Sequence, residues 1–256
     1  MRENKLKRMI KEGKPAIGTL MPGKDPDIVQ FIALLGYDFY FIDGEHGGIG
    51  AETAGTLVRA AQAAGIEPVV RAPSNDPAVI LGYLEAGAYN IVVPHCSTAN
   101  AVRRALAAIK YPPQGMRGSG SSTRAASFGL ELSQADYIRW ANEQTLLLPM
   151  LEEPEAFDNL GEILSVQGLE AVFIGPGDLS LSMGYGGQWD HPAVQEKIGM
   201  GIGLAKSQGI AVANVGRDAA HTRIQIERGC NIIISGAAGL MASACRKYLK
   251  QARLGR

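Results

Sequence analysis

Short apolar runs alternate with longer amphipathic segments along the whole chain. Eight such runs are rich in branched and aromatic residues, are bounded by glycine, proline or aspartate, and cover residues 16–21, 39–43, 68–71, 90–94, 145–151, 171–175, 210–214 and 231–236. Continuous apolar character is typical of parallel strands that are covered on both faces. The pattern therefore predicts eight buried, parallel strands.

The segments between these runs begin and end like helices. Asp25 and Pro26 open one segment and Gly36 closes it, and the same Asp-Pro entry and Gly exit recur at residues 76–77 and 87. These residues are preferred as N-cap, first-turn residue and C-terminal glycine of a helix. Eight strand–helix units favour a (β/α)8 TIM barrel, forming one domain over residues 1–256. An open, Rossmann-like sheet is the alternative.

One connection is unusually long. The segment PPQGMRGSGSSTRAASFG follows residue 111, contains Arg117 and Arg124, and precedes a predicted helix at residues 133–142. A long connection inside a compact domain is typically functional or mobile. The sequence leaves open whether it is a solvated loop or part of a site.

Charge and cysteine usage narrow the class of protein. The 256 residues carry 25 Lys and Arg against 25 Asp and Glu, and because nucleic-acid binding normally needs a basic face, we expect no nucleic-acid partner. Three scattered cysteines, without a CxxC pair, indicate neither a disulfide framework nor a zinc knuckle. The first residues lack an apolar signal core, and no stretch reaches the roughly 18 apolar residues of a membrane span. We therefore expect a cytoplasmic protein without a membrane partner.

Two carboxylates follow neighbouring predicted strands. Active sites of barrels lie at the carboxyl ends of the strands, where Glu152 follows one strand and Asp178 follows the next. Two adjacent anions repel each other unless a cation lies between them, and Mg2+ is commonly held by one or two carboxylates with water and substrate oxygens. The pair predicts a divalent metal site, although Asp178 also fits a plain helix N-cap.

A second cluster follows two earlier strands. Asp43 and His46 lie three residues apart, and Arg71 ends the next apolar run. A carboxylate that holds a histidine raises its basicity, which suits a general base. Arg71 would then bind a substrate carboxylate and stabilise an enolate oxygen, or it forms a structural ion pair with Asp43. His95 also follows a strand, where a packing role is as compatible as a catalytic one.

Two other chemistries are disfavoured. A Schiff-base aldolase needs a lysine inside the barrel, but the lysines fall in terminal or helical segments, and only Lys24 lies near a strand end. No GxGxxG or P-loop motif follows a strand, so a tightly held dinucleotide or ATP is not indicated.

The segments FIDGEHGGIG, YPPQGMRGSG, LLLPMLEEPEAF and VFIGPGDLSLSMGY resemble the HpcH/HpaI aldolases. This resemblance implies a metal-dependent class II aldolase that reversibly cleaves a 4-hydroxy-2-oxo acid, sugar-acid-derived or dicarboxylic, to pyruvate and an aldehyde. It implies a divalent metal, Mg2+ or Mn2+ with Co2+ or Zn2+ as further options. It also implies a homo-trimer or homo-hexamer with an exchanged C-terminal helix.

The resemblance also implies roles for individual residues. His46 is the base, oriented by Asp43, while Glu152 and Asp178 bind the metal and Arg71 stabilises the pyruvate enolate. The backbone at Gly177 and Asp178 holds the pyruvate carboxylate, Arg124 binds an acidic aldehyde, and Glu85 reaches the site of a neighbouring subunit.

The sequence departs from the family pattern at three positions near the rim. Leu20 stands where diacid-cleaving relatives carry a tryptophan, His95 where a methionine is frequent, and Met150 where a glutamine is common. These departures put the aldehyde in question rather than the reaction. The alternatives are a citryl-CoA or malyl-CoA lyase-like enzyme and a barrel that binds 2-oxo acids without turnover.

Overall fold

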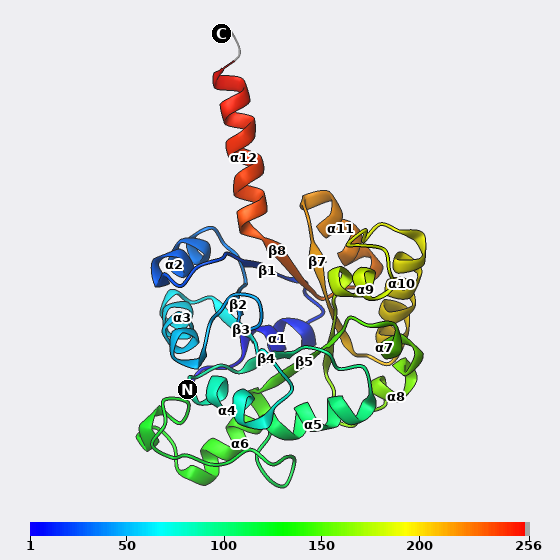
Figure 1. Cartoon of the computed structure of the whole chain (residues 1–256). Helices are drawn as coiled ribbons and strands as arrows, with labels where there is room; N and C mark the ends of the chain where they lie inside the picture. The colour runs from blue at the N-terminus through cyan, green and yellow to red at the C-terminus, as the bar shows by residue number, and fades with distance from the viewer. Residues whose placement is uncertain (254–256) are drawn as a thin grey trace.

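Eight parallel strands close into a barrel in which β8 pairs with β1 (Figure 1). The computed structural model describes residues 1–253, so residues 254–256 of the predicted domain lie outside the described residues. The strands are β1 Ala16–Leu20, β2 Phe39–Asp43, β3 Glu67–Arg71, β4 Asn90–Val93, β5 Leu146–Leu151, β6 Ala171–Ile174, β7 Ala211–Gly216 and β8 Ile232–Gly236. The predicted (β/α)8 barrel is confirmed, and the open sheet is wrong.

The chain also forms helices, most of which surround the barrel. They are α1 Lys5–Lys11, α2 Pro26–Leu34, α3 Ala51–Ala64, α4 Pro77–Glu85, α5 Ala99–Ile109, α6 Gln134–Gln144, α7 Pro154–Asp158, α8 Leu160–Leu164, α9 Pro176–Ser182, α10 Pro192–Ser207, α11 Ala219–Arg228 and α12 Ala237–Ala252. The predicted caps hold: Asp25 accepts a hydrogen bond from Asp27 N and Asp76 accepts one from Ala78 N. The sequence did not predict α1, α7, α8 and α9, because these helices are too short for a helical period to stand out.

The strands bury both of their faces, and alternate residues point into the barrel. The interior is filled mainly by apolar side chains such as Phe39, Phe41, Val69, Leu148 and Met150. The outward residues pack against the helices in a second, larger core. On β2, β3 and β5 the next inward residue, two positions further along the strand, is charged and lies at the carboxyl end.

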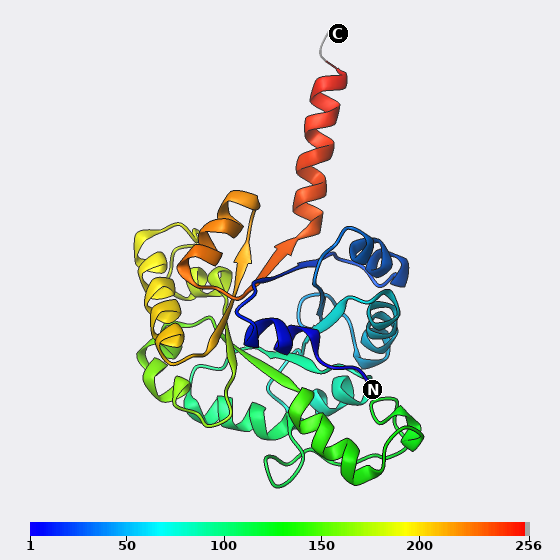
Figure 2. The same cartoon turned by 180° about the vertical axis from the view of Figure 1, so that it is seen from behind.

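The amino ends of the strands are closed by α1, which lies across the barrel (Figure 2). Leu6 of this helix is buried and packs with the interior residues. One end of the barrel is therefore filled by the chain's own N-terminal segment. The carboxyl end has no comparable plug among residues 1–253.

The last helix has a different environment from the others. Figures 1 and 2 show α12 projecting away from the barrel, and none of its residues is buried. It carries exposed Leu240, Met241, Tyr248 and Leu249. No helix within residues 1–253 has the length and apolar character needed to cross a membrane.

Candidate active site

The inward series of three strands ends in charged residues. Asp43 follows Phe41 on β2, Arg71 follows Val69 on β3, and Glu152 follows Met150 just beyond β5. The side-chain period of two therefore points all three toward the barrel axis. The sequence-predicted residues Asp43, Arg71 and Glu152 are all buried at this rim.

Asp43 and Arg71 form a bidentate ion pair. Arg71 Nε donates to Asp43 Oδ1 at 2.9 Å and Nη2 donates to Oδ2 at 2.7 Å. Burial alone would raise the pKa of Asp43, but the hydrogen bonds and charge of Arg71, with those of the His46 and Glu45 amides, lower it below its ordinary value. Arg71 thus forms the structural ion pair with Asp43 that the sequence left as one of two possibilities. It uses Nε and Nη2 for this contact.

The third guanidinium nitrogen of Arg71, Nη1, does not contact Asp43 and points along the rim instead. Nη1 lies 2.9 Å from Glu45 Oε2 and 3.8 Å from Met150 Sδ. The guanidinium carbon also lies 5.8 Å from the centroid of the Phe41 ring. These contacts fix the side chain before any substrate arrives.

His46 lies beside Asp43, but the expected contact between carboxylate and imidazole is not the one formed. Asp43 Oδ1 accepts from the backbone N–H of His46 at 3.2 Å, and the carboxylate nearest the ring is Glu45, whose Oε2 lies 3.7 Å from Nε2. The His46 side chain is 64% exposed. Asp43 therefore fixes the turn that carries His46 rather than the tautomer of its ring.

Two glycines make this turn possible. A Cβ at Gly47 would lie 2.3 Å from Asp43 O, and one at Gly44 would lie 2.5 Å from Arg71 O. Such distances exclude side chains, because the blocking atoms belong to the backbone. The DGEHG sequence thus folds tightly and places His46 over the rim.

Glu152 is a buried acid among other acids. Its side chain is 2% exposed, and its Oε1 accepts from the backbone N–H of His95 at 2.8 Å. Burial raises its pKa, and the charges of Asp178 and Glu45 raise it further, while the His95 N–H and ring oppose the shift. Burial and two neighbouring acids thus both disfavour the charged form of Glu152.

Gly175 packs closely against Glu152 and leaves no room for a side chain of its own. A Cβ at Gly175 would lie 3.0 Å from Glu152 Cβ and 3.1 Å from Oε2, so a side chain here would press on the carboxylate. Gly175 leads into α9, whose first turn contains Gly177 and Asp178. The charge of Asp178 contributes to the raised pKa of Glu152, and the pairing of these two carboxylates at a metal stays a prediction.

His95 belongs to this cluster, although the sequence left its role open. Its φ of 55° is in the left-handed region, and its ring lies 3.1 Å from Glu153 Oε1 and 3.6 Å from both Glu45 Oε1 and Glu152 Oε1. The sequence places Glu45 on the rim facing Arg71, but without a role in the site. Its position in DGEHG was the available signal, but only the fold shows that it contacts Arg71.

Two predicted site residues lie elsewhere in the subunit. Arg124 Nη2 donates to Gln62 Oε1 at 2.5 Å, near the end of α3, and Glu85 pairs with Arg117 at 2.8 Å at the end of α4. Helices that follow parallel strands run back toward the amino ends of those strands, so both residues lie away from the rim that holds Glu152. Within one subunit they do not join the site.

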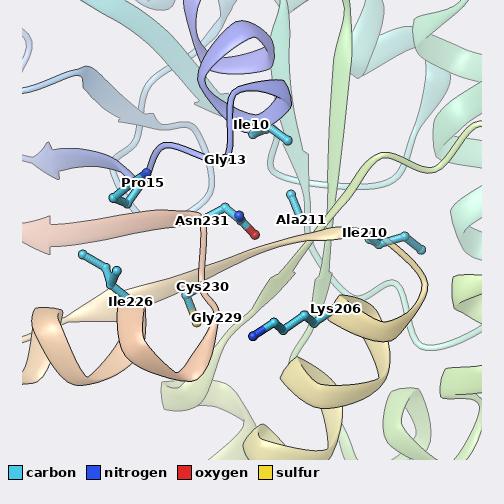
Figure 3. Close-up of a pocket in the computed structure, with 11 residues that line it drawn as sticks. Ile10, Gly13, Pro15, Lys206, Ile210, Ala211, Ile226, Gly229, Cys230 and Asn231 are labelled. Atoms are coloured by element: carbon cyan, nitrogen blue, oxygen red, sulfur yellow. The ribbon is translucent and has the colours of Figure 1, made fainter.

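The barrel's opposite end contains a separate cavity of about 310 Å3 (Figure 3). It is lined where β1, β7 and β8 begin, by residues that include Ile10, Pro15, Lys206, Ala211 and Asn231. The two buried lysines also lie at this end: Lys7 Nζ donates to Glu143 O and Lys110 Nζ to Thr145 O. Neither of these two lysines therefore lies at the rim that holds Glu152.

Comparison with known proteins gives concordant matches. A family described as HpcH/HpaI aldolase/citrate lyase matches residues 16–244. A 4-hydroxy-2-oxo-heptane-1,7-dioate aldolase from Shigella flexneri is 38% identical over 216 residues, covering 83% of this chain and 80% of that protein. A hydroxypyruvate/pyruvate aldolase from Sagittula stellata is 35% identical over 231 residues and 90% of each chain.

Solved structures match over nearly the full length. An HpcH/HpaI aldolase/citrate lyase family protein from Burkholderia cenocepacia superposes with a TM-score of 0.92 at 29% identity, covering 98% of this chain and 99% of that one. A citrate lyase from Burkholderia xenovorans has a TM-score of 0.64 at 17% identity and covers 89% of this chain and 75% of that one. The second likeness shows the fold alone.

Proposed function

Because the chain belongs to the HpcH/HpaI aldolase/citrate lyase family, we propose that it cleaves a 4-hydroxy-2-oxo acid reversibly to pyruvate and an aldehyde. The family and the names of the relatives make the chain a carbon–carbon lyase of the aldolase type that acts on small molecules. One observation carries the specific proposal: a buried acid, a preorganised arginine and an exposed histidine share one rim. The citrate lyase likeness is too remote to favour a CoA-dependent reaction, and the aldolase relatives disfavour a non-catalytic barrel.

The rim residues fit a hard divalent cation. No group of three or more His, Cys, Asp or Glu within residues 1–253 is arranged to hold a metal, but Mg2+ is typically held by only one or two carboxylates. Glu152 and Asp178 would supply that pair. Burial is the first cause of the raised pKa of Glu152, and the charges of Asp178 and Glu45 add to it, so a cation bound at this rim would offset those charges. When bound, Mg2+ or Mn2+, with Co2+ or Zn2+ as alternatives, would polarise the 2-oxo group of the substrate.

The chain's own residues would carry out the proton transfer. His46, exposed above the rim, would accept the proton of the 4-hydroxyl as the C3–C4 bond breaks and the aldehyde forms. The bonding electrons move toward the 2-oxo oxygen, where Arg71 would stabilise the developing enolate charge. Because Asp43 and Glu45 hold Arg71 in place, little reorganisation is needed at that moment.

The remaining predicted residues would hold the two substrate ends. The backbone at Gly177 and Asp178 would bind the pyruvate carboxylate. Arg124 and Glu85 contact Gln62 and Arg117 in their own subunit, so a role in binding the aldehyde would require them to reach a neighbouring subunit's rim.

A pyruvate-release assay tests this proposal. The chain would be incubated with 4-hydroxy-2-oxo acids that have acidic or hydroxylated aldehyde parts, before and after EDTA treatment, with Mg2+ or Mn2+ added back. We expect chelation to abolish release and either metal to restore it. Full activity after exhaustive chelation would contradict the metal site, and no pyruvate from any substrate would contradict the reaction.

The exposed last helix supports a homo-oligomer. A helix of 16 residues without a buried residue, about 24 Å long, leaves its apolar side chains in solvent unless another subunit covers them. Phe31, Leu34 and Leu35 at α2 form a further exposed apolar group. Exchange of α12 between subunits would cover such surfaces in a trimer or hexamer. Light scattering of the full chain and of a chain ending at Gly236 tests this, because we expect only the shortened chain to dissociate.

The predicted cytoplasmic location rests on the sequence alone, as does the predicted absence of nucleic-acid and membrane partners.

A further inference from the structure

The connection between α9 and α10, residues 183–191, approaches the first turn of α9. Trp189 in this connection places its indole Nε1 3.7 Å from the position that a Cβ would take on Gly177. Gly177 and the following Asp178 belong to the rim segment described above. An indole N–H, a donor that cannot accept a hydrogen bond, therefore lies beside the backbone to which the oxo acid's carboxylate was assigned.

Trp189 is held by contacts from two neighbouring elements, one to its backbone carbonyl and one to its indole ring. Gln195 of α10 donates through Nε2 to Trp189 O at 2.7 Å. Arg217, which follows β7, lies 5.9 Å from the centroid of the indole ring. Figure 1 shows α9, α10 and α11 grouped around this part of the barrel. The position of Trp189 is therefore set by the barrel and does not depend on its own loop alone.

Arg217 also ties the loop down through the next residue. Its Nη1 and Nη2 donate to the two oxygens of Asp190 at 2.5 and 2.8 Å. The ring of His191 stacks on that of Tyr185, with centroids 3.6 Å apart. A cavity of about 570 Å3 lies beside these contacts and is lined by residues 187–192 and Arg217, so solvent and small solutes can reach Trp189.

The indole N–H lacks a partner of its own. Among residues 1–253, no acceptor forms a hydrogen bond with Trp189 Nε1, although the side chain is partly buried. The nitrogen is not among the fully buried polar atoms that lack a partner, so it is open to solvent and to a small ligand. The neighbouring acids do not serve, since Asp190 is engaged with Arg217.

We propose that Trp189 is a substrate-binding residue whose indole N–H donates to the carboxylate of the 2-oxo acid, and that Arg217 and Asp190 position it. This inference rests on the proposed function, because it assigns the carboxylate to the segment at Gly177. A neutral donor adds a hydrogen bond to an anion without adding a positive charge that would compete with a metal ion at Glu152. Hydrogen bonds to charged groups are among the stronger ones in proteins.

Replacing the indole by a ring without the N–H tests the proposal. Trp189→Phe should raise the dissociation constant of pyruvate, measured by calorimetry with Mn2+ present, by about tenfold. The maximal rate should change less than the KM for pyruvate, and the KM for the aldehyde should stay within about twofold. Trp140→Phe is the matched control, because Trp140 stacks on Tyr137 of α6, away from the rim. Unchanged pyruvate affinity in Trp189→Phe would overturn the proposal.

Fluorescence gives a second readout that does not require turnover. The chain has two tryptophans, so pyruvate should alter the emission of the wild type and of Trp140→Phe but not that of Trp189→Phe. Arg217→Gln should raise the pyruvate dissociation constant by about threefold, and adding it to Trp189→Phe should have little further effect. Full additivity of the two changes would show that Arg217 does not act through Trp189.

One control separates this inference from the proposed function. Exchange of the methyl protons of pyruvate in D2O reports enolisation without any aldehyde. A wild type that neither binds pyruvate nor exchanges these protons contradicts the proposed function itself. A wild type that exchanges them, with a Trp189→Phe variant that binds pyruvate equally well, contradicts only the role of Trp189.

Discussion

The two ends of the barrel both bury charged side chains, but they neutralise them differently. At the end closed by α1, each buried charge meets donors or acceptors from the chain itself. At the open end, acids outnumber the cations that face them. The same strands connect both ends. The difference in neutralisation therefore comes from the residues that precede and follow the strands.

At the closed end, Asn4 Nδ2 donates to Asn90 Oδ1 at 2.7 Å, and Asn90 Nδ2 donates to Glu67 Oε1 at 3.1 Å. Lys7 Nζ lies 2.7 Å from Glu170 Oε1. These bonds link the first helix to the starts of β3, β4 and β6. Buried polar networks of this kind stabilise a fold when every member is satisfied.

At the open end, Arg71 is shared between Asp43 and Glu45, while Glu152 receives only a backbone N–H and the nearby His95 ring. Charge left unneutralised lowers stability, and such arrangements are typical of sites that bind a ligand. The comparison therefore predicts that mutations at the two ends affect different quantities: activity at the open end and stability at the closed end.

The largest effect is expected from Glu152→Gln. The amide keeps an acceptor for the His95 N–H but removes the charge, so kcat/KM should fall by about three orders of magnitude, and Mn2+ affinity should fall with it. The metal-free protein should be equally or more stable in urea, because a buried charge has been removed. Glu153→Gln is the matched control, with an expected loss below about fivefold. A destabilised but active Glu152→Gln variant would break the comparison.

His46→Ala should have the next largest effect. General-base groups typically contribute about 100-fold or more to the rate, so we expect a loss of about 100- to 1000-fold in retro-aldol turnover. The exposed ring makes few contacts, and the unfolding midpoint should therefore stay unchanged. Calorimetry should find pyruvate and Mn2+ binding within about threefold of the wild type. An unaffected rate would show that another group takes the proton.

The sequence predicted the fold well, because eight apolar runs with helix signals between them leave few topologies. It missed α1, which determines how the barrel is closed. Leu6 and Lys7 are buried there because they pack against the amino ends of the strands. No local sequence pattern indicates that a short helix will close a barrel in this way. Helices of five to seven residues, such as α7 and α9, also lack enough length for a period to appear.

The positions of Asp43, Arg71 and Glu152 at the rim were predictable, because these residues fall next to strand ends. The hydrogen-bond and ion-pair partners of these residues could not be predicted, because they depend on the directions of side chains from neighbouring strands. The sequence suggested that Asp43 holds the His46 ring, whereas Asp43 binds Arg71 and a backbone amide. Arg124 was assigned by resemblance, and its contact with Gln62 reflects the path of a long loop that spacing cannot reveal.

At the closed end, Asn90→Ala should lower the free energy of unfolding by about 3 kcal/mol. The side chain is fully buried and bonds to Asn4, Glu67 and Pro68, so its loss leaves several polar groups without partners. Turnover per folded molecule should not change. Asn100→Ala, on the exposed face of α5, is the matched control and should fall within about 0.5 kcal/mol of the wild type in urea.

The smallest effect concerns pH and Glu67. Burial, only partly offset by the Lys5 N–H and the charge of Arg2, raises the pKa of Glu67 to about 7. The folded protein thus keeps a proton that the unfolded chain, with a pKa near 4.5, has already lost. Stability must then decrease as the pH rises from about 4.5 to about 7.

This contribution is at most about 3 kcal/mol, because a tenfold difference in acidity is worth about 1.4 kcal/mol. Glu67→Gln cannot ionise, but its NH2 group, which cannot accept a hydrogen bond, would face one of the two donors, Lys5 N and Asn90 Nδ2, that now point at oxygens of Glu67. The variant should therefore be less stable than the wild type at pH 5 in urea, and this deficit should shrink by pH 8. A stability deficit that does not change with pH would show that Glu67 is already ionised at pH 5 in the folded protein. The closed end would then neutralise the charge of Glu67 more completely than its burial implies.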